Sequence, residues 1–243
     1  EISKKHLSDK LYLEYQPIVA ATSHERVAFE ALARWRHDGG VIQPEEFVPV
    51  AEKTGLIHSL GEEVIYQACV VAARLNTPVH GAISEHEIVV HANISPHQFR
   101  DASLAKKIAS SLDRSGCKPQ WISLEFTENS MIVDDQRCKT LLAELGGMGI
   151  RFVLDDFGTG YASLGYLRRF PFSNIKIDQS FVHGLLGNEE DRAIVQATIS
   201  MAHALGLPVT AEGIESLDQA QALEELGCDF LQGNYFGMPE PLA

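Results

Sequence analysis

Short apolar runs alternate with helical patterns along almost the whole chain, and this alternation most restricts the folds that it can adopt. The helical patterns place apolar residues three or four positions apart, while the runs between them have the length of buried strands. In four places a glycine stands just before the next run, where a left-handed residue commonly ends a helix. These glycines are Gly116, Gly149, Gly206 and Gly227. The pattern predicts a succession of βα units.

The chain opens differently, with two strand patterns and no helix between them. Residues 11–19 and 26–34 are separated by six residues, too few for a parallel crossover, so we expect an antiparallel hairpin. Six further strands are predicted at 88–92, 121–126, 151–154, 174–177, 208–211 and 229–231. Eight strands in 243 residues predict an α/β fold, a modified TIM (β/α)8 barrel with an antiparallel first strand. An open doubly wound sheet remains the alternative, because periodicity does not separate the two.

Polar residues stand at the ends of seven predicted strands. In a barrel the carboxyl ends of the strands meet at one mouth, where the chemistry of this fold takes place. The residues at these ends are Glu30, Asn93, Glu125, Asp155 with Asp156, Lys176, Glu212 and Gln232. We therefore expect a single site that is rich in carboxylates.

Such a site needs positive charge. Two like charges about 4 Å apart repel by about 4 kcal/mol at an effective dielectric constant near 20. Lys176 and Arg34 supply two positive charges, which leaves room for one or two divalent cations. Oxygen ligands favour Mg²⁺ or Mn²⁺ over zinc. Two such ions can activate a shared water and neutralise a phosphate under attack.

The overall charge restricts the partners. The chain has 33 acidic and 20 basic residues, a formal net charge of −13, and no basic stripe. Binding to DNA or RNA polymers depends on clustered Lys and Arg, so no nucleic-acid polymer is expected as a partner. An anionic substrate would instead require bound cations to neutralise it.

Motifs around the strand ends resemble those of the EAL domain family, which hydrolyses cyclic di-GMP. The segment Glu30-Ala31-Leu32-Ala33-Arg34-Trp35 is similar to the motif that names the family. Further matches follow in family order: Gln16-Pro17-Ile18, Asn93-Ile94-Ser95, Glu125-Phe126-Thr127-Glu128, residues 155–161, Lys176-Ile177-Asp178, residues 211–215 and Gln232-Gly233. A lone Glu-Ala-Leu is a weak signal, but this ordered set spans nearly the whole chain and is very specific.

The resemblance implies two divalent cations, Mg²⁺ or Mn²⁺. One would be held by Glu30, Asn93, Glu125 and Asp155, and the second by Asp155 and Asp156. Ca²⁺ is expected to be inhibitory, because the larger ion tolerates poorer geometry.

The resemblance also implies the reaction, which opens one phosphodiester of cyclic di-GMP to give linear 5'-pGpG. Lys176 would position and polarise the attacking water, and Gln232 would orient a metal-bound water. Glu212 stands where the family has a carboxylate at the metal centre, and Glu30 belongs to the same catalytic group.

Four residues are implied to contact the dinucleotide, and one to link the site to a dimer interface. The contacts would come from Gln16, Leu32, Arg34 and Asp178. Glu128 matches a residue that holds the loop after Asp156 and couples the site to dimerisation. A homodimer and regulation by partner domains are therefore expected.

A receptor that binds cyclic di-GMP without cleaving it, and signals through partner domains, is the alternative function. Degenerate receptors lose a metal ligand or the lysine, and this chain has lost neither. Its departures from the family pattern, at Ser173, Ser216 and Asn234, fall on no predicted ligand. Another metal-dependent barrel hydrolase would fit only if the motif match were accidental.

Single motifs suggest other chemistry less well. Lys176 alone resembles the Schiff-base lysine of an aldolase-type barrel, but nearby carboxylates would keep it charged. The Asp-Phe-Gly at 156–158 lacks the other kinase motifs. The segment from His86 to His91 has three residues rather than two between Glu and the second His, so a structural histidine is expected there, not a zincin site.

We expect residues 1–243 to form a single EAL-type barrel domain cut from a longer multidomain signalling protein with sensor or cyclase domains. No apolar run approaches the ~20 residues of a membrane span, and no leader is visible. A cytoplasmic location is expected, although missing segments could anchor the full-length protein to a membrane. The four cysteines lack C-x-x-C spacing and are expected to be reduced core thiols.

Overall fold

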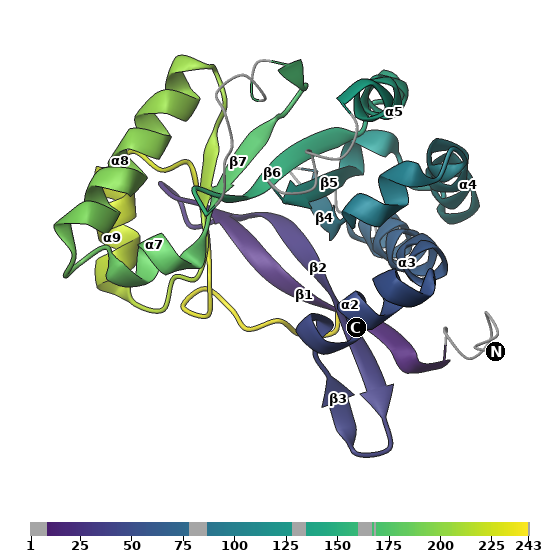
Figure 1. Cartoon of the computed structure of the whole chain (residues 1–243). Helices are drawn as coiled ribbons and strands as arrows, with labels where there is room; N and C mark the ends of the chain where they lie inside the picture. Colours follow the sequence, from purple (N-terminus) through teal and green to yellow (C-terminus); the bar gives the residue numbers. More distant parts are fainter. Residues whose placement is uncertain (1–8, 78–86, 128–134, 160–166, 168, 243) are drawn as a thin grey trace.

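The computed structural model describes residues 9–77, 87–127, 135–159, 167 and 169–242. Its centre is a barrel of eight strands (Figure 1). Around the ring these are β1 Leu11–Ala20, β9 Phe230–Gln232, β8 Val209–Ala211, β7 Asn174–Ile177, β6 Arg151–Phe157, β5 Ile122–Thr127, β4 Val89–Asn93 and β2 Arg26–His37. A second pairing, between β2 and β1, closes the ring.

The first strand runs against both of its neighbours. β1 pairs antiparallel with β2, where Gln16 lies opposite Glu30, and antiparallel with β9. From β2 through β4 to β9 the neighbouring strands are parallel. The predicted barrel and its antiparallel opening hairpin are confirmed. The doubly wound alternative is wrong, because an open sheet would leave two unpaired edges where this one closes.

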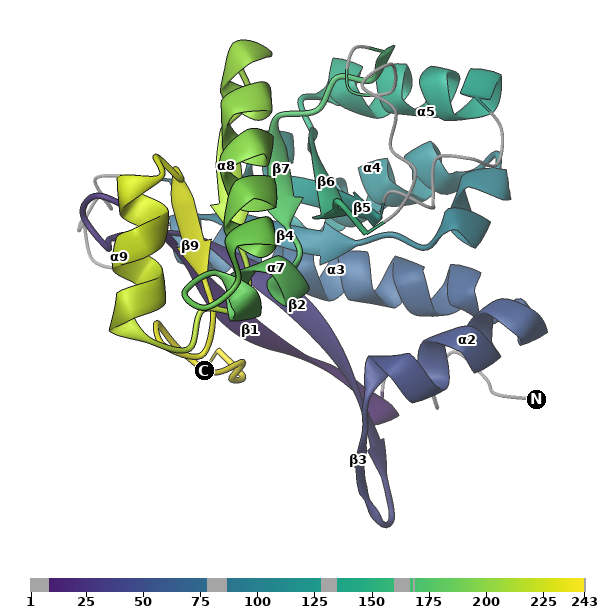
Figure 2. The same ribbon diagram turned by 60° about the vertical axis from the view of Figure 1, so that its left-hand side comes forward.

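A ninth strand, β3 Gly40–Ile42, lies outside the predicted set. It pairs antiparallel with the end of β2, which continues to His37, and the resulting hairpin projects away from the barrel (Figure 2). The residues of β3 are exposed or half-buried. A search for buried apolar runs therefore does not detect it.

Helices cover the barrel on two sides (Figures 1 and 2). One side carries α2 Pro44–Thr54, α3 Ile57–Asn76, α4 Leu104–Ser115 and α5 Asp135–Met148, and the other carries α7 Gln179–Gly184, α8 Glu189–Ala204 and α9 Leu217–Glu225. Two short 3-10 helices span Pro96–Arg100 and Pro119–Trp121. The four glycines predicted to end helices have φ between 68° and 100°, as expected for left-handed caps. Among the described residues, no helix has the length and apolar character needed to cross a bilayer.

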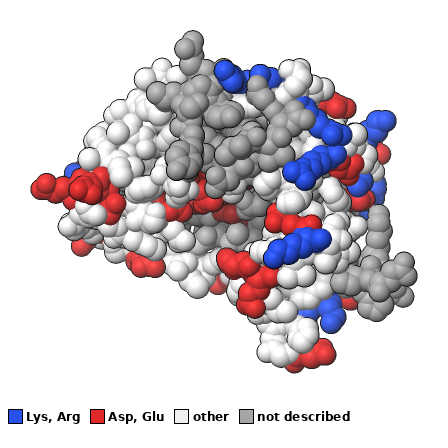
Figure 3. Space-filling view, in the orientation of Figure 1, with Lys and Arg blue, Asp and Glu red and all other residues white. Residues whose placement is uncertain are grey.

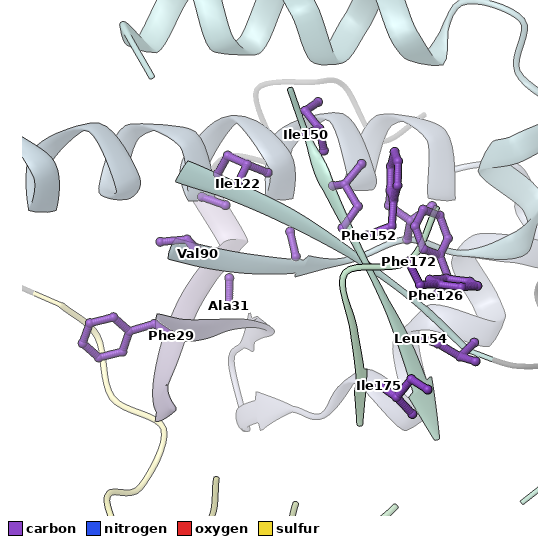
Figure 4. Packing of buried hydrophobic residues seen from close by; sticks show 14 of the residues in the cluster. Phe29, Ala31, Val90, Ile122, Phe126, Ile150, Phe152, Leu154, Phe172 and Ile175 are labelled. Carbon is purple, nitrogen blue, oxygen red and sulfur yellow. The ribbon is translucent and has the colours of Figure 1, made fainter. Parts of the chain in front are cut away.

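The main apolar core lies between the strands and the surrounding helices. Figure 4 shows Phe126, Phe152 and Phe172 of this core beside the strands. The Phe126 and Phe152 rings, from neighbouring strands, have centroids 5.8 Å apart, and Phe99 lies 5.0 Å from Phe126. The four cysteines are buried and free, as predicted. This core attaches the helices to the outer surface of the barrel. The interior of the barrel is filled by a different set of side chains.

Alternation along the strands builds that interior in layers, because every second residue points inward. The upper layer, at the carboxyl ends of the parallel strands, consists of Glu30, Asn93, Glu125, Asp155, Lys176, Glu212 and Gln232. The lower layer, one inward position below, includes the polar residues His91, Ser123, Asn174 and Thr210. A separate small apolar cluster of Ile18, Ala28 and Val89 lies at this lower level. Most barrels fill such layers with branched apolar residues, so the polar layers here are a distinct feature.

Candidate active site

Lys176 occupies the centre of the upper layer. Its side chain is fully buried, and its Nζ lies 2.8 Å from Glu30 Oε2, 3.0 Å from Glu125 Oε2 and 2.6 Å from Glu212 Oε1. Asp155 Oδ1 is 3.7 Å away. Four predicted carboxylates from four strands therefore surround one ammonium group, and the predicted convergence at the mouth is present in the structure.

The ammonium group stays charged. Burial by itself would lower the pKa of Lys176, but the carboxylates of Asp155, Glu125, Glu212 and Glu30 hold that pKa well above its usual value. A Schiff-base lysine must be a neutral amine to attack a carbonyl. The surroundings of Lys176 are therefore unsuited to aldolase-type chemistry.

Glu30 is the most strongly held of the carboxylates. Asn93 Nδ2 donates to its Oε1 at 2.8 Å, while Lys176 Nζ and Gln232 Nε2 donate to its Oε2 at 2.8 and 2.7 Å. Burial raises the pKa of Glu30, but the charge of Lys176 and these three donors outweigh it and lower the pKa to about 2. The chain's own donors are thus sufficient to keep Glu30 ionised without a bound metal ion.

Asp155 and Asp156 are adjacent in β6, and adjacent strand residues normally point to opposite faces. Here the β6–β7 register shifts between Leu154 and Phe157. Asp156 has a φ of 55°, in the left-handed region that Asp tolerates better than most residues, and its N–H donates to Asp155 Oδ1 at 3.0 Å. Because of this irregularity, carboxylate oxygens of Asp155, Asp156 and Glu212 all lie within 4.8 Å of one another.

These three carboxylates form the best candidate cation site among the described residues. Burial raises the pKa of Asp155 to about 6, and it raises the pKa of Glu212 well above its usual value. A bound cation would favour the ionised form of both carboxyl groups. Their oxygen donors suit a hard ion such as Mg²⁺ or Mn²⁺. In the view of Figure 3, acidic side chains (red) lie on both sides of the centre of the molecule.

Gln232 adds an acceptor to this region. Its Nε2 donates to Glu30 and to Gln16 Oε1 at 3.1 Å, while its buried Oε1 has no partner in the described part of the chain. A buried amide oxygen without a partner is costly, so this atom suits a bound water or ligand. The following Gly233 is required sterically, since a Cβ there would lie 2.2 Å from backbone atoms of Ile214.

Two predicted substrate contacts line a large pocket beside the upper layer. The pocket has a volume of about 620 Å³, and its walls include Leu32, Arg34 and Asn93. Arg34 Nε lies 2.7 Å from Glu14 Oε2, and Arg34 has no contact with the upper-layer carboxylates among those found in the described residues. The expectation that Arg34 compensates their charge is therefore wrong, and Lys176 alone of the two does so.

The other predicted contacts are placed less directly. Gln16 hydrogen-bonds through Nε2 to Asn234 Oδ1 and to the Gly237 carbonyl, both at 3.3 Å. Asp178 is the N-cap of α7, where its Oδ1 accepts from the Ser180 N–H at 3.0 Å. Glu128, predicted to couple the site to a dimer interface, lies outside the described residues.

His91 lies directly below the upper layer, in contact with Glu125. It was expected to be merely structural, yet its Nδ1 lies 2.7 Å from Glu125 Oε1, and both side chains are buried. His91 is two residues before Asn93 in β4, so the strand alternation already places the two on one face. His86, the other histidine of the rejected zincin motif, is outside the described residues.

Comparisons with known proteins agree with this arrangement. The family model described as "EAL domain" matches residues 1–239. The chain is 40% identical over 233 residues to the Pseudomonas aeruginosa protein named bifunctional diguanylate cyclase/cyclic di-GMP phosphodiesterase MucR, covering 96% of this chain and 33% of that one. It is 36% identical over 244 residues to the cyclic di-GMP phosphodiesterase NbdA of the same organism, covering 100% of this chain and 30% of that one. The chain thus spans about a third of the length of these curated relatives.

Solved structures of EAL proteins are similar to this chain over most of its length. The structure described as the PaMucR phosphodiesterase in complex with c-di-GMP superimposes with a TM-score of 0.89 at 38% identity, covering 96% of this chain and 93% of that one. A second, the EAL enzyme Bd1971 with cAMP and cyclic di-GMP, has a TM-score of 0.88 at 32% identity, covering 96% of this chain and 63% of that one. This chain therefore belongs to the EAL domain family.

Proposed function

We propose that the chain is a metal-dependent phosphodiesterase that hydrolyses cyclic di-GMP to linear 5'-pGpG. The observation that carries this proposal is the complete upper layer, in which Lys176 contacts four carboxylates from different strands at one mouth. The relatives named as cyclic di-GMP phosphodiesterases support the choice of substrate.

Two divalent cations, when bound, would lower the pKa of a water and neutralise the negative charge of the phosphodiester. We assign one to Glu30, Asn93, Glu125 and Asp155, and the other to Asp155 and Asp156, with Glu212 at the same centre. The close oxygens of Asp155, Asp156 and Glu212 support this assignment. Mg²⁺ and Mn²⁺ suit the oxygen donors, and we expect Ca²⁺ to inhibit.

Lys176 acts in this proposal through its charge. Its ammonium group remains protonated among the carboxylates, so it cannot remove a proton from water as a general base. It can position and polarise the attacking water, and it can stabilise charge that develops on the phosphate oxygens. Gln232 Oε1, which has no partner in the described residues, accepts a hydrogen bond from that water.

The substrate would lie across the mouth and into the adjoining pocket of about 620 Å³. Leu32 and Arg34 line this pocket. Gln16 accepts a hydrogen bond from Gln232. Asp178 is near Asp156: burial is the largest cause of the raised pKa of Asp156, and the negative charge of Asp178 is the next. We propose all four as dinucleotide contacts.

We also propose that the domain works inside a longer cytoplasmic signalling protein, as a homodimer whose interface is coupled to the site through Glu128. The relatives are about three times as long as this chain, which supports the presence of further domains.

The deciding experiment incubates the purified domain with cyclic di-GMP and Mg²⁺ or Mn²⁺ and separates the nucleotides by chromatography. We expect 5'-pGpG to form with either ion and to be absent with EDTA. A parallel titration measures binding of cyclic di-GMP in Ca²⁺. Tight binding without product in Mg²⁺ or Mn²⁺ would contradict the proposal and favour a receptor.

A further inference from the structure

Glu125 is held from two directions. Its Oε2 receives Lys176 Nζ at 3.0 Å within the upper layer, and its Oε1 lies 2.7 Å from His91 Nδ1 in the lower layer. Glu125 is completely buried and His91 is 8% exposed. Within the described residues, the other side-chain partners of the upper-layer carboxylates belong to the mouth itself, so the contact with His91 links the two layers.

This hydrogen bond does not depend on where the proton resides. If Glu125 is ionised, the His91 Nδ1–H donates to it, and if Glu125 is protonated, its O–H donates to Nδ1. In either case the ring of His91 supplies one directed contact to the Glu125 carboxylate.

A pocket lies on the other side of His91. It has a volume of about 490 Å³ and is lined by His91, Ser123 and Arg151 together with apolar residues such as Ile18 and Phe230. Because these residues belong to the lower layer and the amino ends of the strands, the pocket lies at the end of the barrel opposite the mouth. The hydroxyl of Ser123 is buried and has no partner in the described residues, as expected beside a space that water can fill.

We propose that His91 is a positioning residue that orients the Glu125 carboxylate from below, and that the lower pocket gives small molecules access to this contact. The inference rests on the proposed function in one respect, the role of Glu125 as a cation ligand. It goes further in assigning a task to the opposite end of the barrel.

The physical reason is the freedom of a carboxylate about its last torsion, which is broad and two-fold. Without His91, Oε1 would be a buried acceptor with no partner, and the group could turn toward Lys176. Loss of a hydrogen bond that orients a metal ligand typically weakens metal affinity by about 10–100-fold. The effect should therefore appear in cation binding before any turnover takes place.

The test compares His91→Ala, His91→Asn and Ser123→Ala by calorimetric titration with Mn²⁺ in the absence of nucleotide. We expect binding to weaken by about 10–100-fold in His91→Ala. Asparagine carries its amide nitrogen at the position of Nδ1, so His91→Asn should retain most of the affinity. Ser123→Ala alters the same pocket without touching Glu125, and it should bind like the wild type.

Imidazole provides the second readout. Truncation of His91 joins its space to the lower pocket, so added imidazole should restore Mn²⁺ affinity to His91→Ala, after correction for its effect on the wild type and on Ser123→Ala. If His91→Ala does not fold, as judged by circular dichroism, His91→Gln replaces it, because its amide reaches the position of Nε2 instead of Nδ1.

The outcomes separate the inference from the proposed function. Equal Mn²⁺ affinity in the wild type and His91→Ala would overturn the inference whatever the turnover. Equal losses in His91→Asn and His91→Ala, or no effect of imidazole, would also overturn it. If the wild type binds Mn²⁺ and His91→Ala binds it more weakly as expected, but the wild type hydrolyses no cyclic di-GMP, the proposed function is contradicted and the inference stands. A wild type that binds no Mn²⁺ would overturn both.

Discussion

The two sides of the mouth, one with Glu30 and the other with Asp155, share Lys176 but shift the pKa of a buried carboxyl group in opposite directions. On one side Glu30 receives three side-chain donors, and its pKa falls to about 2. On the other, Asp155 is 3.7 Å from the ammonium and accepts one backbone N–H, and its pKa rises to about 6.

The difference shows which negative charges the protein neutralises itself and which ones a bound ion would neutralise. Glu30 is neutralised by groups that the chain itself supplies. The cluster of Asp155, Asp156 and Glu212 has more negative charge than its donors offset, and its members have raised pKa values. A divalent cation therefore gains most on this second side.

The largest effect is expected from Glu30→Ala, which removes the acceptor shared by Asn93, Lys176 and Gln232. Three donors lose their partner at once, and a proposed cation ligand is lost, so turnover should disappear. The measurement is 5'-pGpG formation in Mn²⁺, with Glu25→Ala as a surface carboxylate control. Turnover close to that of the wild type would show that the two sides do not act as one site.

Lys176→Met removes the charge common to both sides while keeping an unbranched side chain. We expect kcat to fall by about 10²–10³-fold, as when a group that stabilises transition-state charge is lost. Binding of cyclic di-GMP, measured in Ca²⁺, should change much less. A rise in Kd as large as the fall in kcat would mean that Lys176 serves binding rather than catalysis.

Replacement of Mg²⁺ by Ca²⁺ tests the cation side with the chain unchanged. Ca²⁺ accepts looser coordination at longer distances, so nucleotide should still bind while most of the turnover is lost. Parallel binding and product assays in each ion make the comparison. Equal rates in the two ions would argue against a two-metal mechanism.

The smallest effect concerns pH. The pKa of Asp155 is raised from 3.8 to about 6, so below pH 6 a proton competes with the cation. Mn²⁺ affinity should therefore fall by up to about tenfold for each pH unit below 6. Calorimetry at constant ionic strength between pH 5 and pH 7 measures this, and a flat profile would contradict it.

The same shift has a stability counterpart of known sign. Without a cation, the folded protein binds the Asp155 proton more tightly than the unfolded chain does. Stability of the cation-free protein should therefore decrease as pH rises from about 4 to about 6, and added Mn²⁺ should offset the loss.

Much of the fold was predictable because it depends on periodicity. Alternating apolar runs and left-handed glycines such as Gly116 and Gly149 give the strands and their connections, and strand ends give the mouth. β3 was not predictable in this way, because its stability comes from pairing with β2 and not from burial.

The sequence predicted which residues meet at the mouth when they stand at the ends of strands. It did not predict contacts that depend on how far along a strand a residue lies. Arg34 is four residues beyond Glu30 in β2, about 13 Å at the usual strand rise, and there it meets Glu14. His91 shows the reverse. It looks like a core residue in sequence, and only the packing of β4 beside β5 brings its ring to Glu125.

The reversed direction of β1 determines where neighbouring domains can join. In an all-parallel barrel the chain enters at the end opposite the mouth. Here Leu11 lies opposite Trp35, beyond Glu30 along β2, and Glu240 is bridged to Tyr15 in the same region. A segment that continued the chain before β1 or after this bridge would therefore leave the barrel beside the mouth and not at its opposite end.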